Sequence, residues 1–177
     1  MHSIRLATLE DVRFLADVVV EATRAQGRLP DDFDEKDFRI GFAEWTTEQV
    51  ASTESGSTTS VIEVDGRDVG RLRVVRTGVE IELAGIQLLP DAQSRGIGSR
   101  VIADLISEAA ETQRPIVLSV ESDNPRAQDL YLRLGFIETE RNADEVKMAI
   151  AVPSSINLSS PRPGGGESST GSGPGTR

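Results

Sequence analysis

The sequence contains no cysteine and one histidine, His2. Without cysteine the chain has no disulfide bond, no thiolate nucleophile and no cysteine-ligated metal. A single histidine beside the N-terminus cannot form a catalytic or metal-binding histidine cluster, and we interpret His2 as a surface residue. We therefore expect no metal site.

Long apolar runs are missing as well. No stretch approaches the length of a membrane span, and no N-terminal segment has the charged-then-apolar pattern of a signal peptide. The 29 acidic residues exceed the 19 basic ones, and the net charge of −10 argues against binding of nucleic acid through its phosphates. These observations predict a soluble, cytoplasmic protein with no nucleic-acid and no membrane partner.

The length of 177 residues suits one domain with a sizeable core, followed by a tail of different composition. Residues 153–177 consist mostly of glycine, proline and serine. Such a segment buries too little apolar surface to offset the entropy lost on ordering. We divide the chain into a domain at 1–152 and a disordered tail at 153–177.

The most informative stretch is 79–100, VEIELAGIQLLPDAQSRGIGSR. Its first five residues alternate apolar and acidic, as in a half-buried strand. The alternation breaks down around Gly85, which indicates a bulge or a close approach of the backbone to a ligand. Pro90 ends the ladder, and glycines then lead into a predicted helix over 97–111.

The glycine-rich turn at 93–98 has the features of an anion site. The first N–H groups of a helix have no intrahelical partner, and the helix dipole places partial positive charge there. The turn can thus hold a phosphate or pyrophosphate, with Arg95 and Arg100 adding formal charge. A dinucleotide fingerprint would need glycine at Val101, and a P-loop would need Lys-Ser/Thr after the glycines. An ordinary strand–turn–helix connection is the alternative.

Two motifs carry a family resemblance. The Q-x-x-G-x-G pattern of 93–98, after a strand ending in L-x-P, resembles the acyl-CoA-binding motif of the GCN5-related N-acetyltransferases. Residues 119–136, SVESDNPRAQDLYLRLGF, resemble the closing segment of that family, in which N-x-x-A precedes a helical L-Y and then G-F. The matching positions are Asn124, Ala127, Leu130, Tyr131, Gly135 and Phe136. Two independent motifs in the right order are more specific than either one.

The element order fits the same family. Periodicity, capping and turn signals predict strands at 3–6, 61–64, 69–75, 79–89, 116–120, 136–140 and 146–152, and helices at 8–25, 35–51, 97–111 and 125–134. Asp65-Gly66 is a hairpin turn, and 52–59 reads as a loop. The resemblance implies an α/β (α+β) fold of order βααβββαβαββ, in which a mixed, mainly antiparallel sheet of about seven strands carries helices on both faces.

The resemblance also implies the residues of the site. Coenzyme A would be bound by the two motifs and the strand end before them: Leu88, Leu89, Gln93, Ser94, Arg95, Gly96, Ile97, Gly98, Ser99, Asn124, Ala127 and Tyr131. Tyr131 would be the general acid that protonates the sulfur of coenzyme A, although its spacing alone also fits a core aromatic residue. Asn124 would bind the pantetheine arm, cap the helix that starts at Pro125, or do both. The backbone N–H of Leu88 is the candidate oxyanion donor.

The general base is less clearly indicated. Glu82 lies in a strand that we expect to be largely buried, near the position where several family members carry a catalytic glutamate. It could instead face solvent in alternation with Glu80. Glu80 and Glu121 are further candidates, and a water chain alone serves many relatives.

The amine acceptor is not specified by the sequence. In this family the connection between the first two helices lines the acceptor pocket, and here it carries four acidic residues within 31–35, which either attract a cationic amine or form a solvated loop. Phe42 and Trp45 are interpreted as core residues of the second helix, with a place in the pocket as the alternative.

The sequence predicts an N-acetyltransferase that moves an acetyl group from acetyl-CoA to a small-molecule or peptide amine by direct attack in a ternary complex. A non-catalytic acyl-CoA-binding module of the same fold and a nucleotide-phosphate-binding domain are the alternatives. A homodimer stays open, because relatives often dimerise.

Overall fold

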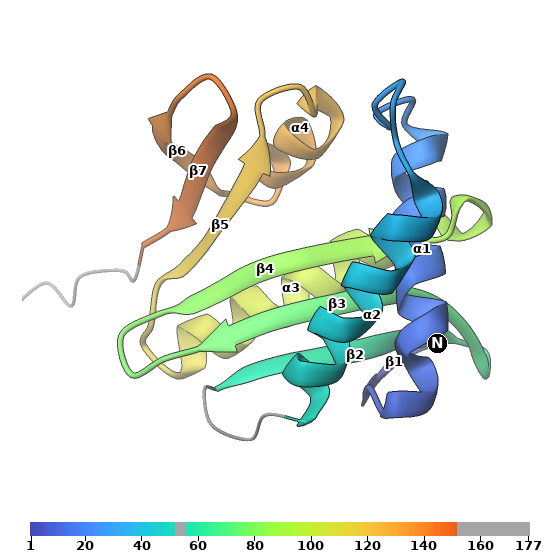
Figure 1. Cartoon of the computed structure of the whole chain (residues 1–177). Coiled ribbons are helices and arrows are strands. Elements are labelled where there is room, and N and C mark those ends of the chain that lie inside the picture. The colour runs from blue at the N-terminus through green and yellow to red at the C-terminus, as the bar shows by residue number, and fades with distance from the viewer. Residues whose placement is uncertain (52–55, 152–177) are drawn as a thin grey trace, which may run out of the picture.

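A computed structural model of the chain describes residues 1–51 and 56–151. Its elements follow the expected order (Figure 1). The strands are β1 (His2–Leu6), β2 (Ser57–Val64), β3 (Arg67–Arg76), β4 (Ile81–Leu88), β5 (Ile116–Glu121), β6 (Ile137–Arg141) and β7 (Glu145–Ile150). The α-helices are α1 (Val12–Ala25), α2 (Glu35–Ala51), α3 (Ile97–Glu111) and α4 (Pro125–Arg133), and two single 3₁₀ turns, η1 (Leu9–Asp11) and η2 (Pro90–Ala92), precede α1 and α3.

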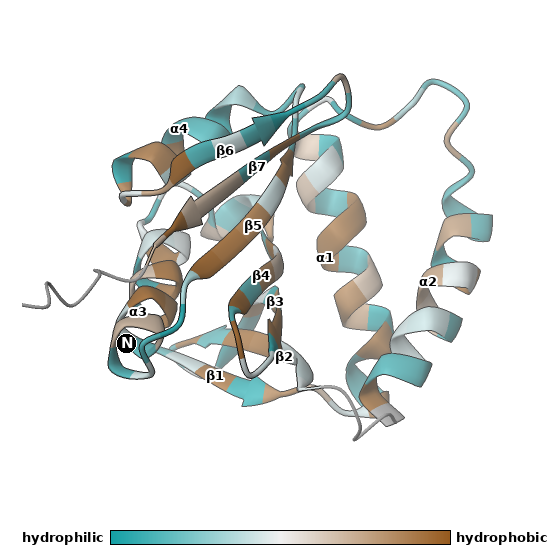
Figure 2. Cartoon of the chain, turned by 90° about the vertical axis from the view of Figure 1, so that its left-hand side faces the viewer, coloured by the Kyte–Doolittle hydropathy of each residue, from teal (hydrophilic) through white to brown (hydrophobic). Residues whose placement is uncertain are grey.

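The strands form one seven-stranded sheet in the order β1-β2-β3-β4-β5-β7-β6. Every neighbouring pair is antiparallel except β4 and β5, which are parallel. Helices α1 and α2 lie on one side of the sheet, and α3 and α4 lie on the other (Figures 1 and 2). This arrangement confirms the mixed, mainly antiparallel fold with helices on both faces.

The main core lies between the sheet and the α3–α4 layer. Val101 and Ile102 of α3 pack with Ile81 of β4, Ile116 of β5 and Phe136, all of them almost completely buried. Burial of such side chains stabilises the fold by about 1.5–3 kcal/mol each. The core thereby fixes the start of α3 and the whole of α4 against the middle of the sheet.

Local signals account for most element boundaries. The Thr8 N–H donates to Asp11 Oδ2 at 2.8 Å, a capping interaction just before α1. Asp65 and Gly66 have φ values of 52° and 77°, the left-handed conformations that a tight hairpin turn requires.

The predicted loop over 52–59 is wrong in its last part, because β2 begins at Ser57 and not at Val61. Thr58 and Thr59 pair with Val74 and Arg73 of β3. Their β-branched side chains suit a strand despite their polarity. Residues 52–55 and the predicted tail lie outside the described residues.

The two central strands separate soon after they meet. The β4–β5 pairing consists of Ile81 with Ile116 and Glu82 with Val117. Beyond it the strands diverge, as Figure 1 shows. On the β3 side, Arg73 faces Gly85 while Val74 faces Leu83, so Ala84 is the extra residue of a bulge, as the broken alternation predicted. The divergence leaves one edge of β4 unpaired with β5 after Glu82.

Across the described ranges, the helices are all too short or too polar to cross a membrane.

Candidate functional site

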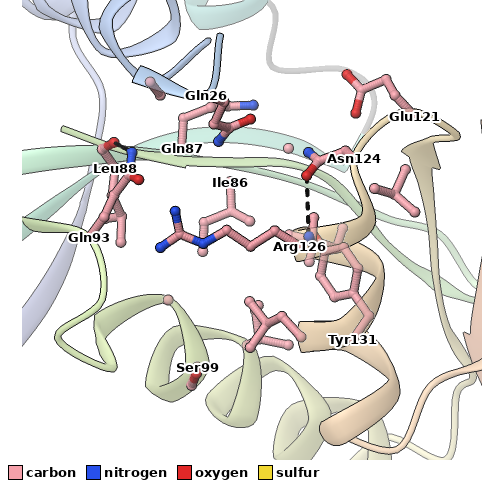
Figure 3. A pocket seen from close by; sticks show the side chains of 18 of the residues that line it. Gln26, Ile86, Gln87, Leu88, Gln93, Ser99, Glu121, Asn124, Arg126 and Tyr131 are labelled. Carbon is pink, nitrogen blue, oxygen red and sulfur yellow. Dashed lines mark hydrogen bonds between the residues drawn. The ribbon is translucent and has the colours of Figure 1, made fainter. Parts of the chain in front are cut away.

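A cavity of about 480 Å³ lies where β4 and β5 diverge. Its wall includes the second half of β4, the last residues of β5, the start of α3, the inner face of α4 and the C-terminal turn of α1 (Figure 3). Of the residues that the sequence predicted to bind coenzyme A, those that line it are Leu88, Gln93, Ser94, Gly96, Ile97, Gly98, Ser99, Asn124, Ala127 and Tyr131. The fold therefore brings both motifs to one cavity.

The start of α3 presents free backbone donors to this cavity. Gly96 caps the helix with φ 73°, and no side chain caps its first turn. Ser94 also has a positive φ, 60°. The first intrahelical bond of the turn runs from Arg100 N–H to Gly96 O at 3.1 Å, so the N–H groups of Ile97, Gly98 and Ser99 have no carbonyl within the helix. Such an end is a binding site for anions such as a pyrophosphate.

Gly98, in the first turn of α3, faces β4. A Cβ atom at this position would lie 3.8 Å from Leu88 Cδ1 and 4.0 Å from Ile86 Cδ1, and all three residues line the cavity. A methyl group there would be in ordinary contact with the strand and would occupy part of the cavity wall.

The backbone of Leu88 faces the diverging edge of β4. Leu89 N–H donates to Val69 O of β3 at 2.9 Å. Because backbone groups alternate along a strand, the N–H and C=O of Leu88 point away from β3. Gln93 Nε2 donates to that carbonyl at 2.9 Å, which leaves the Leu88 N–H as the donor toward the cavity. Leu89 itself does not line the cavity.

Asn124 performs the capping role that the sequence left open. Its Oδ1 accepts the N–H of Ala127 at 3.2 Å, drawn as the dashed line in Figure 3, and Pro125 occupies the first position of α4. Since the cap uses the oxygen, the amide nitrogen remains a donor to the cavity that Asn124 lines. Capping and ligand binding are therefore compatible.

Tyr131 projects from α4 into the cavity wall with an exposed fraction of 8%. Its ring packs edge-on against Phe136 at 5.6 Å between centroids. Burial, followed by the negative charge of Glu121, raises the pKa of the Tyr131 phenol to about 12. The phenol is thus protonated throughout the physiological pH range and can act as a proton donor.

Three arginines that the sequence analysis missed line the cavity: Arg28 after α1, and Arg126 and Arg133 of α4. Arg126 Nη2 donates to Ser94 Oγ at 2.7 Å, which links α4 to the glycine turn. Arg126 follows Pro125 inside the second motif, a signal that could have identified it, whereas nothing in the sequence around Arg28 indicates its position. The positive charge suits a ligand that carries phosphates.

The other predicted residues lie elsewhere. Arg95 is exposed and does not line the cavity. Glu82 is half-buried and lines a separate hollow of about 390 Å³ together with Glu80 and Lys147, whereas Glu121 lines the main cavity.

The acidic connection after α1 also lies apart from the cavity. None of its carboxylates, at Asp31, Asp32, Asp34 and Glu35, belongs to the cavity wall. Glu35 binds Arg24 and Arg39 instead. Among the residues that the structure describes, no group of three or more histidine, cysteine or acidic side chains could hold a metal ion.

Comparison with known proteins identifies the fold and the family. Three solved structures share the fold. The N-acetyltransferase PaiA of Thermoplasma acidophilum, in complex with coenzyme A, has a TM-score of 0.72 at 17% identity, covering 84% of this chain and 98% of that chain. A chimera of the spermidine N-acetyltransferase SpeG from Vibrio cholerae and hSSAT has a TM-score of 0.65 at 19% identity, covering 85% of this chain and 95% of that chain. The structure of YncA from Salmonella typhimurium, with its cofactor acetyl-CoA, has a TM-score of 0.57 at 21% identity, covering 88% of this chain and 96% of that chain. The model of the acetyltransferase (GNAT) family matches residues 17–136, and the chain therefore belongs to this family.

Proposed function

We propose that the protein transfers an acetyl group from acetyl-CoA to the amine of a small-molecule or peptide acceptor, by direct attack within a ternary complex. The observation that carries this proposal is the convergence of the free α3 N-terminus, the Leu88 N–H and Tyr131 on one cavity between diverging strands. The glycine turn at 93–98 precedes Tyr131 by 33 to 38 residues in the sequence, and the fold alone brings them together.

The cavity has the donors that coenzyme A needs. The N–H groups of 97–99 and the side chain of Arg126 would hold the phosphates, and the Asn124 amide would hold the pantetheine arm. The unpaired edge of β4 would pair with the pantetheine amides as an added strand does. When bound, acetyl-CoA supplies the activated acetyl group as a thioester.

The side chains and backbone of this chain then serve the transfer. The Leu88 N–H would stabilise the negative charge that develops on the carbonyl oxygen as the amine nitrogen bonds to the acetyl carbon. Tyr131 would give its proton to the sulfur as the carbon–sulfur bond breaks. The proton lost by the amine would pass to Glu82 through water, with Glu121 as the other candidate. The products are an N-acetylated amine and free coenzyme A.

A thermal-shift titration with acetyl-CoA, coenzyme A, ATP and NAD tests the cofactor. A ligand that binds only the folded state raises the melting temperature as its concentration passes Kd. We expect a rise with acetyl-CoA and coenzyme A alone. No shift with acetyl-CoA at millimolar concentration would contradict the transferase proposal.

A thiol-release assay over a panel of amines tests turnover. We expect Tyr131→Phe to lower kcat by about 10²-fold, the lower end of the general-acid range, while the shift with acetyl-CoA stays unchanged. Binding of acetyl-CoA with no thiol release from any amine would favour the non-catalytic acyl-CoA-binding module. A cytoplasmic location and a homodimer stay predictions.

A further inference from the structure

Two arginines on β3, one buried and one half-buried, lie next to the cavity without an acidic partner among the described residues. Arg71 has an exposed fraction of 5%, and Arg73, two residues on, is half-buried on the same face of the sheet. Among the described residues, no carboxylate lies within ion-pair distance of either guanidinium, and the Nε atom of each lacks a hydrogen-bond partner. By contrast Arg76, further along the strand, forms an ion pair with Glu108 at 2.6 Å.

Aromatic rings and amides surround the two guanidinium groups. Arg71 lies over Phe42 and Trp45 of α2, at 5.5 and 5.7 Å from the ring centroids, and Arg73 lies over Trp45 at 5.1 Å. Arg71 Nη1 donates to Gln87 Oε1 at 2.9 Å, and Arg73 Nη2 donates to Gln49 Oε1 at 3.2 Å. These neutral contacts hold the side chains in place and leave their charge uncompensated.

An uncompensated buried cation is costly, and the chain has no shortage of carboxylates with a net charge of −10. Burial, followed by repulsion from Arg73, lowers the pKa of Arg71 to about 10, so the group still carries its charge at neutral pH. An anion bound beside the pair would relieve both effects. Because the chain itself supplies no such anion from its described residues, the arrangement suits one that arrives with a ligand.

The pair lies directly behind the wall of the cavity. Gly85 and Gln87, which line the cavity on β4, face Arg73 and Arg71 in the sheet register. A Cβ atom on Gly85 would lie 3.0 Å from Arg71 Nη1, so the absence of a side chain admits the guanidinium to this position. In Figure 3, Gln87 and Gln26, which follows α1, lie on the same side of β4, and Ile86 lies on the side of α3. The arginines themselves do not line the cavity, but Arg71 contacts Gln87 of its wall, and both lie on the α2 side of the sheet, away from the anion site at α3.

We propose that Arg71 and Arg73 bind an anionic group, a carboxylate or a phosphate, on the amine that accepts the acetyl group. An oxygen of this group would join or replace Gln87 Oε1 at Arg71 Nη1, and the planar guanidinium suits paired oxygens. Trp45, with an exposed fraction of 37%, flanks the approach to Arg73. The substrate class is thus an amine that carries an acid, in contrast to a polycation such as spermidine. This inference rests on the proposed acetyltransferase function.

Matched pairs of amines test the substrate class with the full chain and acetyl-CoA. Ornithine and putrescine differ by a carboxylate, and phosphoethanolamine and ethanolamine differ by a phosphate, while spermidine represents the polycations. We expect kcat/KM to be roughly 10- to 100-fold higher for the anionic member of at least one pair, as a charge-assisted contact provides. The pair that shows the difference identifies carboxylate or phosphate. Equal or better use of the decarboxylated amines or spermidine would overturn the inference and leave the acetyltransferase proposal intact.

Three variants connect that preference to the arginines. In Arg71→Gln and Arg73→Gln we expect KM for the anionic amine to rise roughly 10- to 100-fold, with kcat and the use of the partner that lacks the acidic group little changed. Arg67→Gln is the control that should keep the preference. Arg67 is an exposed arginine on the same strand as Arg71 and Arg73, and it pairs with Asp91 of η2. Retention of the preference in both test variants would overturn the assignment.

Thermal shift separates failure of this inference from failure of the proposed function. Each variant should still be stabilised by acetyl-CoA, which shows that it is folded and that the cofactor site is intact. The half-buried Arg73 serves as the test should Arg71→Gln not fold. In the wild type, the anionic amine without acetyl-CoA should raise the melting temperature, and its partner that lacks the acidic group should not. If acetyl-CoA stabilises the protein and no anionic amine does, the inference is wrong and the cofactor site stands.

Discussion

The phenol of Tyr131 is held in its protonated form by its surroundings, and this can be measured directly because the chain has no other tyrosine. Burial comes first and the charge of Glu121 second in raising its pKa to about 12. Titration followed by the ultraviolet absorbance of tyrosinate should therefore give a single late transition. We expect Glu121→Gln to lower the pKa by a few tenths, because it removes a nearby negative charge.

Glu82→Gln is the matched control for this titration. Glu82 lines the other hollow, so its replacement should leave the transition unchanged.

The pH dependence of the free energy of unfolding follows from the same pKa shift. The unfolded chain loses the tyrosine proton near pH 10 and the folded chain near 12, so stability falls as the pH rises from 10 toward 12. Circular dichroism at each pH shows whether the protein is still folded. A transition near pH 10 in the folded protein would contradict the burial of the phenol.

Glu82 is the proposed base, and its position requires a water relay. Its side chain lies in the second hollow, while its neighbours Leu83 and Ala84 line the main cavity. We expect Glu82→Gln to lower kcat/KM at neutral pH by about 10²-fold, at the low end of general-base effects. The loss should shrink as the pH rises, because more of the amine is then deprotonated in solution.

Glu121→Gln in the same pH series distinguishes the two carboxylates. Glu121 would be the base if the pH profile of kcat/KM in Glu82→Gln matches the wild type while kcat/KM of Glu121→Gln is lowered on the acidic side of the profile. Unchanged profiles in both variants would indicate that water alone accepts the proton.

At the scale of elements, the site depends on the way that α3 begins beside β4. Gly98 occupies the second position of the helix, with space for a Cβ atom at ordinary contact distance from Leu88. We expect Gly98→Ala to fold and to gain about 0.5 kcal/mol in the free energy of unfolding, because alanine favours helix over glycine. The added methyl group fills part of the cavity wall, and the Kd for acetyl-CoA should rise about tenfold, which corresponds to about 1.4 kcal/mol.

Gly41→Ala in α2 provides the matched control. No atom lies within 4 Å of a Cβ built at Gly41, so this substitution should raise stability by about 1 kcal/mol. Its affinity for acetyl-CoA should equal that of the wild type. Chemical denaturation and titration calorimetry measure the two quantities. Equal affinity in Gly98→Ala and the wild type would place the bound cofactor away from the start of α3.

At the scale of the whole molecule, the sequence predicts the order of the elements well because its signals are local. Each signal acts within a few residues of the element that it defines. Examples are the hairpin glycine at Gly66, the helical spacing of apolar residues after Gly96 and the helix cap at Asn124-Pro125. The start of β2 was misplaced because Thr58 and Thr59 are polar and owe their strand conformation to pairing with β3. The paired residues of β3 lie about 15 residues further along the chain, and the periodicity of a short segment contains no information on a strand that pairs with it from that distance.

The proposed cofactor side of the site could be predicted from the sequence for the same reason, since most of its residues belong to two contiguous motifs. The acceptor side does not. Arg71 and Arg73 read as the polar positions of an alternating strand, and Phe42 and Trp45 read as the apolar face of a helix. Only the packing of α2 over β3 shows that these residues meet, and that Trp45 remains 37% exposed rather than part of the core.

The buried arginine pair connects stability with function over the whole molecule. Lowering the pKa of Arg71 to about 10 corresponds to an unfavourable contribution of about 3 kcal/mol at 1.36 kcal/mol for each pKa unit. The ring contacts return about 1–2 kcal/mol. The hydrogen bond to Gln87 returns about 1 kcal/mol. Replacement by an apolar side chain of similar length should therefore be neutral or stabilising, by up to about 1 kcal/mol.

We expect Arg71→Met to show this gain in chemical denaturation while it loses the preference for anionic amines. Arg76→Met is the matched control on the same strand, because Arg76 pairs with Glu108 through two contacts of 2.6 and 2.9 Å. Its loss leaves Glu108 with only the longer contact to Arg114, at 4.0 Å, and should cost about 1 kcal/mol, the opposite sign. If Arg71 is retained for binding at a cost in stability, the two substitutions should change the free energy of unfolding in opposite directions, although the arginines are only five residues apart. A clear loss of stability in Arg71→Met would instead make Arg71 a structural residue that α2 needs for packing.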